Sequence, residues 1–273
     1  MRDVLVHYLL RLLSFDMIAR IAKAFQRSAS DREQLRKVHA TATTVFTGKT
    51  VVEGPFRGLQ YADWRGHGSA VFAKLLGADE AELHPFIETV LASGPETVVD
   101  IGCAEGFYVV GCARRLPTSR LIAADLSPSA RELCVRMAQL NGVDERVDVI
   151  GRVTREDLLG LWSESPGWLI SDCEGGEAEL FDPEVFSRFA GWFILIELHE
   201  FLVPGIEERL IGEASRTHAV EVVDSIDDYR RERLWPRPCL EGVPSEIRHE
   251  FYREGRPGLM RWICASPLAL SNR

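Results

Sequence analysis

The sequence predicts an α/β fold built on a doubly wound, seven-stranded and mostly parallel sheet, and three observations carry this prediction. Short apolar runs alternate with helical stretches from residue 97 onward, which is typical of consecutive strand–helix–strand units. The run from Val98 to Ile101 has the composition of a strand buried on both faces, as strands of parallel sheets are. The chain has 273 residues, 46% hydrophobic and 27% charged, the balance of a globular protein with a substantial core.

The alternation places each element along the chain. Strands are expected at 97–101, 121–124, 147–150, 168–171, 193–198, 219–223 and 260–265. Helices are expected at about 108–116, 128–140, 155–162 and 205–216, with one more that has Pro183 near its start. Asn141-Gly142 is a typical helix stop. The segment 225–258 contains four prolines and is expected to be an insertion that forms part of a substrate pocket, with Trp235 as a candidate lid residue.

The first 92 residues are expected to be a helical extension, 1–92, that precedes the main domain at 93–273. Apolar residues recur at helical spacing over 3–27, so these helices would cover the main domain or form a homodimer surface. Further expected elements are a polar helix at 28–40, a small hairpin at 41–60, a loop at 61–69 and a helix at 79–91. The loop mixes aromatic, basic and glycine residues, which suits either a ligand-facing loop or a merely exposed turn.

Composition narrows the class of partner. The net charge is -9 and the pI about 5.4, so we expect a small-molecule substrate and no nucleic acid, whose phosphates require a basic face. Six cysteines without a C-x-x-C pair suggest reduced thiols in a cytoplasmic protein. The apolar N-terminal run is interrupted by Arg11, Asp16 and Arg20, so neither a signal peptide nor a membrane helix is expected. Attachment to a membrane surface through its basic side is the alternative.

The stretch from Thr97 to Gly106 is a strand that leads into a glycine-bearing turn and then a helix. A dinucleotide fingerprint would need glycines where the chain has Ala104 and Phe107, so a pyrophosphate is disfavoured. The pattern that fits is Asp-x-Gly-x-x-x-Gly, from Asp100 through Gly102 to Gly106, whose glycines leave the backbone open to a ligand. An ordinary tight turn is the alternative interpretation.

This pattern resembles the first motif of class I S-adenosylmethionine (SAM) methyltransferases, which have a Rossmann-like fold. The resemblance implies that the turn cradles the methionine half of SAM, which carries an ammonium and a sulfonium. Asp100 and Glu105 suit such a cationic ligand and would repel a pyrophosphate. The residues implied in cofactor binding here are Asp100, Gly102, Cys103, Ala104, Glu105 and Gly106.

Asp125 ends the second expected strand. Ligands of open parallel sheets bind beyond the carboxyl ends of the strands, so this carboxylate would accept hydrogen bonds from both ribose hydroxyls. The alternative is a helix cap, although Ser127 could fill that position. Leu126 beside it, and Arg152 and Val153 after the third strand, are expected to flank the rest of the nucleoside by topology alone.

An acidic hexapeptide, Asp172 to Glu177, follows the fourth expected strand. Clustered acids repel one another unless a cation or a hydrogen-bond donor lies among them. The hexapeptide resembles the Asp-x-Glu-Gly-x-Glu signature of FkbM-type methyltransferases, and Ile196-Glu197-Leu198-His199 resembles the end of strand five in that branch. The resemblance covers roughly residues 95–223. It implies O-methylation of sugars or other natural-product hydroxyls.

Methyl transfer requires alignment of donor and acceptor and the removal of one proton. Asp172, His199 and Glu174 are the candidate catalytic residues, and Asp172 is also expected to contact the cofactor near the transferable methyl. His199 is the best base at neutral pH by its ordinary pKa, with Glu174, Glu177 and Glu197 as alternatives. The same three residues could hold a divalent metal, which is not expected because this branch is not uniformly metal-dependent. Two alternatives are an N-methyltransferase acting on an amino acid or peptide nitrogen, and a non-catalytic SAM-binding regulator.

Overall fold

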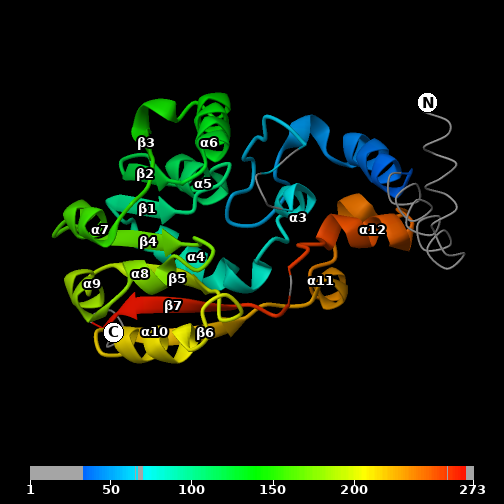
Figure 1. Ribbon diagram of the computed structural model, residues 1–273. Coiled ribbons are helices and arrows are strands. Elements are labelled where there is room, and N and C mark those ends of the chain that lie inside the picture. The colour runs from blue at the N-terminus through cyan, green and yellow to red at the C-terminus, as the bar shows by residue number, and fades with distance from the viewer. Residues whose placement is uncertain (1–32, 65, 67–69, 257, 269–273) are drawn as a thin grey trace, which may run out of the picture.

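A seven-stranded sheet forms the centre of the computed structural model, which describes residues 33–64, 66, 70–256 and 258–268 (Figure 1). The sheet has the strand order β3-β2-β1-β4-β5-β7-β6. The five strands from β3 to β5 pair in parallel, and β7 is antiparallel to both β5 and β6. The strands are β1 Thr97–Ile101, β2 Arg120–Ala124, β3 Val147–Ile150, β4 Gly167–Ser171, β5 Phe193–Leu198, β6 His218–Asp224 and β7 Arg261–Pro267. The predicted seven-stranded, mostly parallel sheet is confirmed.

Helices cover both faces of the sheet, so every position of β1, β4 and β5 is buried. Side chains alternate between two cores: Val98 lies in one, and Val99 and Ile101 lie in the other. The helices of the first core include α4 His84–Ser93, α5 Phe107–Arg115 and α6 Pro128–Leu140. Those of the second are α7 Arg155–Leu161, α8 Glu177–Leu180, α9 Pro183–Arg188 and α10 Ile206–Ala214.

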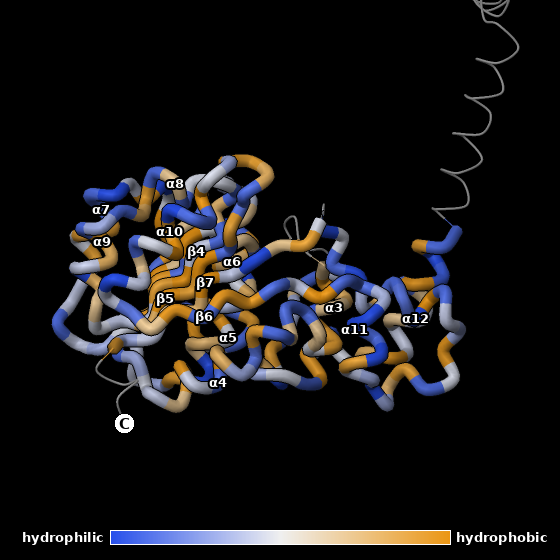
Figure 2. Tube along the Cα trace, turned by 90° about the horizontal axis from the view of Figure 1, so that it is seen from below, coloured by the Kyte–Doolittle hydropathy of each residue, from blue (hydrophilic) through white to orange (hydrophobic). Residues whose placement is uncertain are grey.

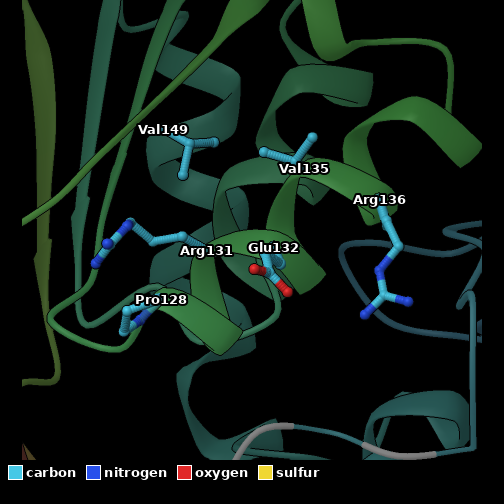
Figure 3. A pocket seen from close by; sticks show the side chains of 6 residues that line it. All are labelled: Pro128, Arg131, Glu132, Val135, Arg136 and Val149. Atoms are coloured by element: carbon cyan, nitrogen blue, oxygen red, sulfur yellow. The ribbon is translucent and has the colours of Figure 1, made fainter.

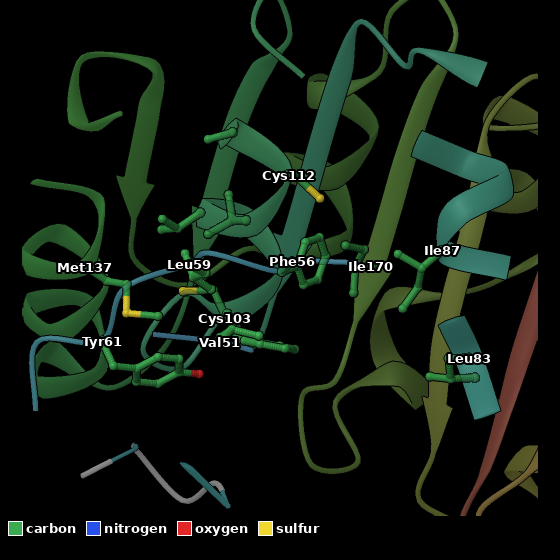
Figure 4. Close-up of a cluster of buried hydrophobic side chains, with 14 of the residues drawn as sticks. Val51, Phe56, Leu59, Tyr61, Leu83, Ile87, Cys103, Cys112, Met137 and Ile170 are labelled. Carbon is green, nitrogen blue, oxygen red and sulfur yellow. The ribbon is translucent and has the colours of Figure 1, made fainter. Parts of the chain in front are cut away.

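The hydropathy of the chain follows this layering. Apolar segments are concentrated in the central strands, and the surrounding helices alternate between apolar and polar residues (Figure 2). Figure 4 shows part of the first core, where Phe56 and Leu59 from the N-terminal segment lie beside Cys112 of α5 and Ile170 of β4. The N-terminal segment therefore contributes to the same core as the sheet.

The expected hairpin at 41–60 in the N-terminal segment is shorter than predicted. Residues 33–45 are helical, so the first five positions of the expected 41–60 hairpin belong to a helix. Val38, Ala42 and Phe46 are buried at a spacing of four, and this apolar stripe extends the helix. A short hairpin-like pairing follows, in which Thr50 and Gln60 form an antiparallel bridge.

The expected helix at 79–91 is divided in two. A short 3-10 helix, η2 Ala81–Leu83, precedes α4, which begins at His84 with Pro85 in its first turn. Proline fits there because the first turn of a helix leaves its N–H groups without intrahelical partners. Glu80 has a left-handed backbone, with φ 46°, and this turns the chain before η2.

The insertion packs on the N-terminal segment beside the sheet. It contains α11 Asp228–Leu234, η4 Pro238–Leu240 and α12 Ser245–Tyr252. Figures 1 and 2 both show α12 next to α3 Val71–Leu76, and α11 packs on α12. Phe251 packs edge-on against Phe46 and Phe72, with ring centroids 5.6 and 5.2 Å away. The fully buried Arg231 joins α11 to Glu82 of η2 at 3.2 Å.

Some sequence predictions lie outside the described residues, namely the helices at 3–27, positions 28–32 of the polar helix expected at 28–40, and positions 65 and 67–69 of the loop expected at 61–69. Within the described residues, no helix combines the length and apolar character needed to cross a membrane.

Candidate active site

A cavity of about 1080 Å³ opens beyond the carboxyl ends of β1, β2, β4 and β5. This is the usual position for ligands in an open parallel sheet. Most of the residues predicted to bind cofactor or to act in catalysis line it: Asp100, Gly102, Cys103, Ala104, Asp125, Leu126, Arg152, Val153, Asp172, Glu174 and His199. Glu105 and Gly106 are not among its lining residues.

The turn after β1 is fixed by the neighbouring strands. The N–H groups of Gly102 and Cys103 both donate to the carbonyl of Ala124 at the end of β2, at 2.8 and 3.1 Å. Gly102 has φ 84°, and a Cβ there would lie 1.6 Å from the carbonyl oxygen of Asp172. Gly102 is therefore required because the backbone after β4 approaches it closely. The sequence prediction had explained this glycine by the close approach of a ligand.

Asp125 faces the turn and does not cap the next helix. Its Oδ2 accepts a hydrogen bond from the Ala104 N–H at 3.0 Å, and its Oδ1 accepts one from the Ser127 N–H at 2.8 Å. The N-cap of α6 is Ser127. Since each carboxylate oxygen has more than one acceptor site, the half-buried Asp125 can still accept hydrogen bonds from a ligand in the cavity.

Glu105 lies behind the turn, away from the cavity. Its side chain is buried, and Oε1 accepts hydrogen bonds from Lys74 Nζ at 3.1 Å and from the Tyr61 hydroxyl at 3.3 Å. Lys74 therefore balances a charge that the sequence argument assigned to a cationic cofactor. Glu105 fixes the turn to α3, and Lys74 itself lines the cavity.

Asp100 is the buried acid at the β1 end of the cavity. It is 3% exposed, and its Oδ2 accepts a hydrogen bond from the Val109 N–H at 3.2 Å. Burial raises the pKa of Asp100 to about 7. The hydrogen bond from Val109 lowers this pKa, but by less than burial raises it. The carboxyl group therefore titrates near neutral pH.

Carboxylates converge on His199 at the other end of the cavity. His199 Nε2 lies 3.6 Å from Asp172 Oδ1 and 3.6 Å from Glu174 Oε2. Glu197 Oε2 of β5 is 3.8 Å from the same nitrogen. The structure thus brings together the three residues predicted to act in catalysis, which come from segments after two adjacent strands.

The acids of the hexapeptide have different functions. Glu177 is fully buried, and its carboxylate accepts hydrogen bonds from the N–H groups of Cys173 at 2.7 Å and Gly175 at 2.9 Å. It thereby shapes the turn after β4. Glu174 has a left-handed backbone, with φ 53°, and its side chain is 80% exposed. Because Glu174 and Glu177 are the same residue type in one hexapeptide, the sequence alone could not distinguish their functions.

Glu177 also orients the histidine. His199 Nδ1 lies 3.2 Å from Glu177 Oε1, on the side of the ring opposite to Asp172 and Glu174. Burial lowers the pKa of His199, but the carboxylates of Glu177 and its neighbours outweigh that effect, so the net shift is upward. Burial raises the pKa of Glu177, but His199 and the backbone N–H groups lower it further, so Glu177 stays ionised.

Sequence reasoning missed a buried network around Arg256 on the wall of the same cavity. The Arg256 guanidinium contacts Glu80 at 2.6 Å and Glu254 at 2.7 Å, and it also pairs with Glu197. The Tyr108 hydroxyl donates to Glu80 as well. Nothing in the spacing signals this network, because its members come from β5, α5, the insertion and the segment before η2. Trp235, the candidate lid residue, is not among the residues that line the cavity.

A second hollow, about 660 Å³ in volume, lies on the surface of α6 beside β3 (Figure 3). Its lining residues are Pro128, Arg131, Glu132, Val135, Arg136 and Val149. None of the candidate catalytic or cofactor-binding residues lies there, so we place the functional site in the larger cavity.

Comparisons with known proteins give distant similarities. No protein-family model matches the chain. A ribosomal RNA large subunit methyltransferase G from Magnetococcus marinus is 29% identical over 129 residues, which are 45% of this chain. The chain spans 31% of the length of that curated relative.

Solved structures with low sequence identity are also similar. A precorrin-6y C5,15-methyltransferase from Geobacter metallireducens has a TM-score of 0.46 and 11% identity, over 71% of this chain and 88% of that one. A second similar structure is a geranyl diphosphate C-methyltransferase from Streptomyces coelicolor in complex with Mg²⁺, geranyl diphosphate and S-adenosyl-L-homocysteine. Its TM-score is 0.43 and its sequence identity 16%, over 72% of this chain and 82% of that one. An O-methyltransferase from Bacillus cereus has a TM-score of 0.43 and 10% identity, over 68% of this chain and 81% of that one. The fold assignment rests on the strand order and the pairing of the strands, which are those of a doubly wound, mostly parallel α/β sheet with an antiparallel β7.

Proposed function

We propose that this chain is a SAM-dependent methyltransferase that transfers a methyl group to a hydroxyl of a small molecule or sugar. One observation carries the proposal: a single cavity joins a nucleoside-type crevice at the ends of β1 and β2 to an acid–imidazole cluster at the ends of β4 and β5. Its volume of about 1080 Å³ is at the upper end for a small-molecule site, so it has room for a cofactor and an acceptor.

The crevice suits SAM by its chemistry. Asp125 is positioned to accept hydrogen bonds from the ribose hydroxyls, and the turn from Gly102 to Ala104 lies beneath the amino-acid part. Leu126 and Val153 supply apolar contacts to the base, and Arg152 lies at the rim. Asp100 provides a carboxyl group for the ammonium. Glu105, which Lys74 neutralises, supports the turn from behind.

SAM, when bound, supplies a methyl carbon on a positively charged sulfur, which keeps the electron pair of the broken bond. The protein must align the acceptor oxygen with that carbon and accept the hydroxyl proton. We assign this task to Asp172, Glu174 and His199, whose polar atoms face the cavity. Where no cation lies among them, His199 Nε2 is the proton acceptor and Glu177 stabilises the imidazolium that forms.

An N-methyltransferase is the second candidate. The carboxylates of the cavity, among them Asp79, Asp172 and Glu174, would attract an acceptor that carries an ammonium group. The third candidate is a non-catalytic SAM-binding regulator. Ribosomal RNA, named for the curated relative, is disfavoured as a substrate by the net charge of -9.

Calorimetric titration of the full chain with SAM tests the proposal. We expect one binding event per chain, and a structure with S-adenosyl-L-homocysteine should place the sulfur toward Asp172. A screen of sugar, phenol and amine acceptors, read as S-adenosyl-L-homocysteine release, then separates the candidates. Absence of SAM binding would refute the enzyme, turnover on amines alone would select N-methylation, and binding without turnover on any acceptor would select the regulator.

A further inference from the structure

Three potential metal ligands converge at the ends of β4 and β5. Asp172, Glu174 and His199 each offer one ligand atom, and these atoms all lie within 4.8 Å of one another. The two carboxylate oxygens are each 3.6 Å from His199 Nε2. A positive charge between the two carboxylates and the imidazole nitrogen would reduce the repulsion between the carboxylates.

His199 Nε2, the ring nitrogen that faces the cluster, makes no hydrogen bond within the described part of the chain. The His199 side chain is only 2% exposed, and Nδ1 lies 3.2 Å from Glu177 Oε1, so the nitrogen left without a partner is Nε2, which faces the cluster. Nε2 lies 3.6 Å or more from its neighbouring carboxylates, beyond the range of about 2.7 to 3.2 Å for an N–H···O bond. The polar atoms of so deeply buried a side chain are normally satisfied, so a ligand bound between Nε2 and the carboxylates would supply the missing partner.

The separation fits a shared cation better than a shared proton. Ligand atoms about 2.0 to 2.3 Å from one ion lie roughly 3 to 4 Å apart when they subtend ordinary coordination angles. The observed 3.6 Å falls in that range. A proton held between Nε2 and a carboxylate would instead draw the two atoms into hydrogen-bond distance.

Glu177 fixes which nitrogen faces the cluster. Its carboxylate is held by the N–H groups of Cys173 and Gly175 and lies 3.2 Å from His199 Nδ1. A carboxylate on this side favours the proton on Nδ1, which leaves the lone pair of Nε2 directed at Asp172 and Glu174. Metal-ligating histidines are commonly oriented by such a carboxylate on the second nitrogen.

We propose that Asp172, Glu174 and His199 bind a divalent cation. One imidazole and two carboxylates leave coordination positions open, and this mixed set should bind Mn²⁺ and Zn²⁺ more tightly than Mg²⁺. The use of the cation rests on the proposed function, since an ion here would orient the acceptor hydroxyl and lower its pKa. His199 would then be a ligand of the ion instead of the base.

Titration of the full chain with MnCl₂, followed by the electron paramagnetic resonance signal of free Mn²⁺, tests the site. We expect one equivalent to bind, and Glu174→Gln and His199→Gln to weaken binding at least tenfold. Glu174 is 80% exposed, so its substitution leaves the core intact. Glu179→Gln is the matched control, because Glu179 lines the same cavity as an exposed acid paired with Arg152 and should leave Mn²⁺ affinity unchanged.

Two results would overturn the proposal. One is the absence of saturable Mn²⁺ or Zn²⁺ binding at millimolar concentration in a protein that still binds SAM. The other is equal Mn²⁺ affinity in the wild type and Glu174→Gln, which would mean that the ion binds elsewhere. Mn²⁺ binding that depends on Glu174 in a protein that does not bind SAM would support the cation site and refute the methyltransferase, so the two failures are distinguishable.

Discussion

The two ends of the cavity differ in whether backbone groups or side chains form them. At the β1–β2 end, backbone groups set the shape: Gly102 and Cys103 bond to the carbonyl of Ala124, and Asp125 holds the N–H of Ala104. We call this the cofactor half. At the β4–β5 end, the acceptor half, side chains of Asp172, Glu174 and His199 converge with no hydrogen bond among them.

This difference separates affinity from chemistry. A surface made from backbone groups keeps its shape when one side chain changes, so variants in the cofactor half should alter SAM binding or stability without disturbing the acceptor half. A cluster of charged side chains depends on each member, because removal of one leaves the others unbalanced. Variants in the acceptor half should therefore alter turnover far more than SAM affinity.

The strongest test of this division is His199→Gln. We expect turnover to fall by about 10²- to 10⁴-fold, whether His199 accepts the proton itself or holds the proposed cation that lowers the pKa of the hydroxyl, while the Kd for SAM stays within about twofold. S-adenosyl-L-homocysteine release and calorimetry measure the two quantities. His249→Gln is the control, since His249 stacks on Tyr229 and does not line the cavity. Equal losses in turnover and SAM affinity would contradict the division.

Asp100→Asn probes the buried acid of the cofactor half. The pKa of Asp100 in the folded chain, about 7, exceeds its ordinary value of 3.8. The unfolded chain therefore loses this proton at lower pH than the folded chain, and the carboxyl group destabilises the fold increasingly as pH rises toward 7. Asparagine does not ionise, so the variant does not lose stability in this way as pH rises. Relative to the wild type, its unfolding free energy should gain about 2 to 3 kcal/mol between pH 5 and pH 8.

Urea unfolding at the two pH values measures this gain. Asp148→Asn removes the same charge from an exposed position beside Arg120 and is the matched control. If the difference between Asp100→Asn and the wild type were the same at both pH values, the acid would not titrate in this window.

Asp125→Ala tests the ribose position. Loss of a charged hydrogen-bond acceptor typically costs about 1.5 to 3 kcal/mol, so the Kd for SAM should rise roughly 10- to 100-fold. Asp125→Asn should be milder, because an amide oxygen can still accept the Ala104 N–H. Asp148→Ala, at the exposed end of β3, serves as the control. Unchanged SAM affinity in Asp125→Ala would remove the ribose assignment.

The sequence was informative where local pattern decides structure. The run from Val98 to Ile101 is buried at every position, so its apolar character marked a central strand. Asp125, Asp172 and His199 were found together because parallel strands bring their carboxyl ends to one edge. The antiparallel insertion of β7 between β5 and β6 could not be foreseen, since pairing depends on long-range packing and not on the composition of one strand.

Ion pairs between distant segments were equally invisible. Lys74 neutralises Glu105 from a helix whose sequence gave no sign of a partner, so Glu105 was assigned to the cofactor. Arg256 reaches Glu80 and Glu197 from the insertion, and only the packing of that insertion beside the sheet brings them into contact. Charge type can be inferred from sequence, but the partner of a buried charge depends on the tertiary fold.

The smallest effect is expected at the rim of the acceptor half, where Phe201→Ala removes an aromatic face. Phe201 lines the cavity, is 54% exposed and lies with its ring centroid 6.0 Å from that of His199. Loss of this face should raise the KM for the acceptor about three- to tenfold, or roughly 0.7 to 1.4 kcal/mol, through lost apolar contact. SAM affinity and thermal stability should stay at wild-type values, because the side chain is mostly solvent-exposed.

Leu202→Ala is the control, since Leu202 is 48% exposed and does not line the cavity. A rise in the Kd for SAM instead of the KM would mean that Phe201 belongs to the cofactor half, and the boundary between the halves would then lie on the other side of His199.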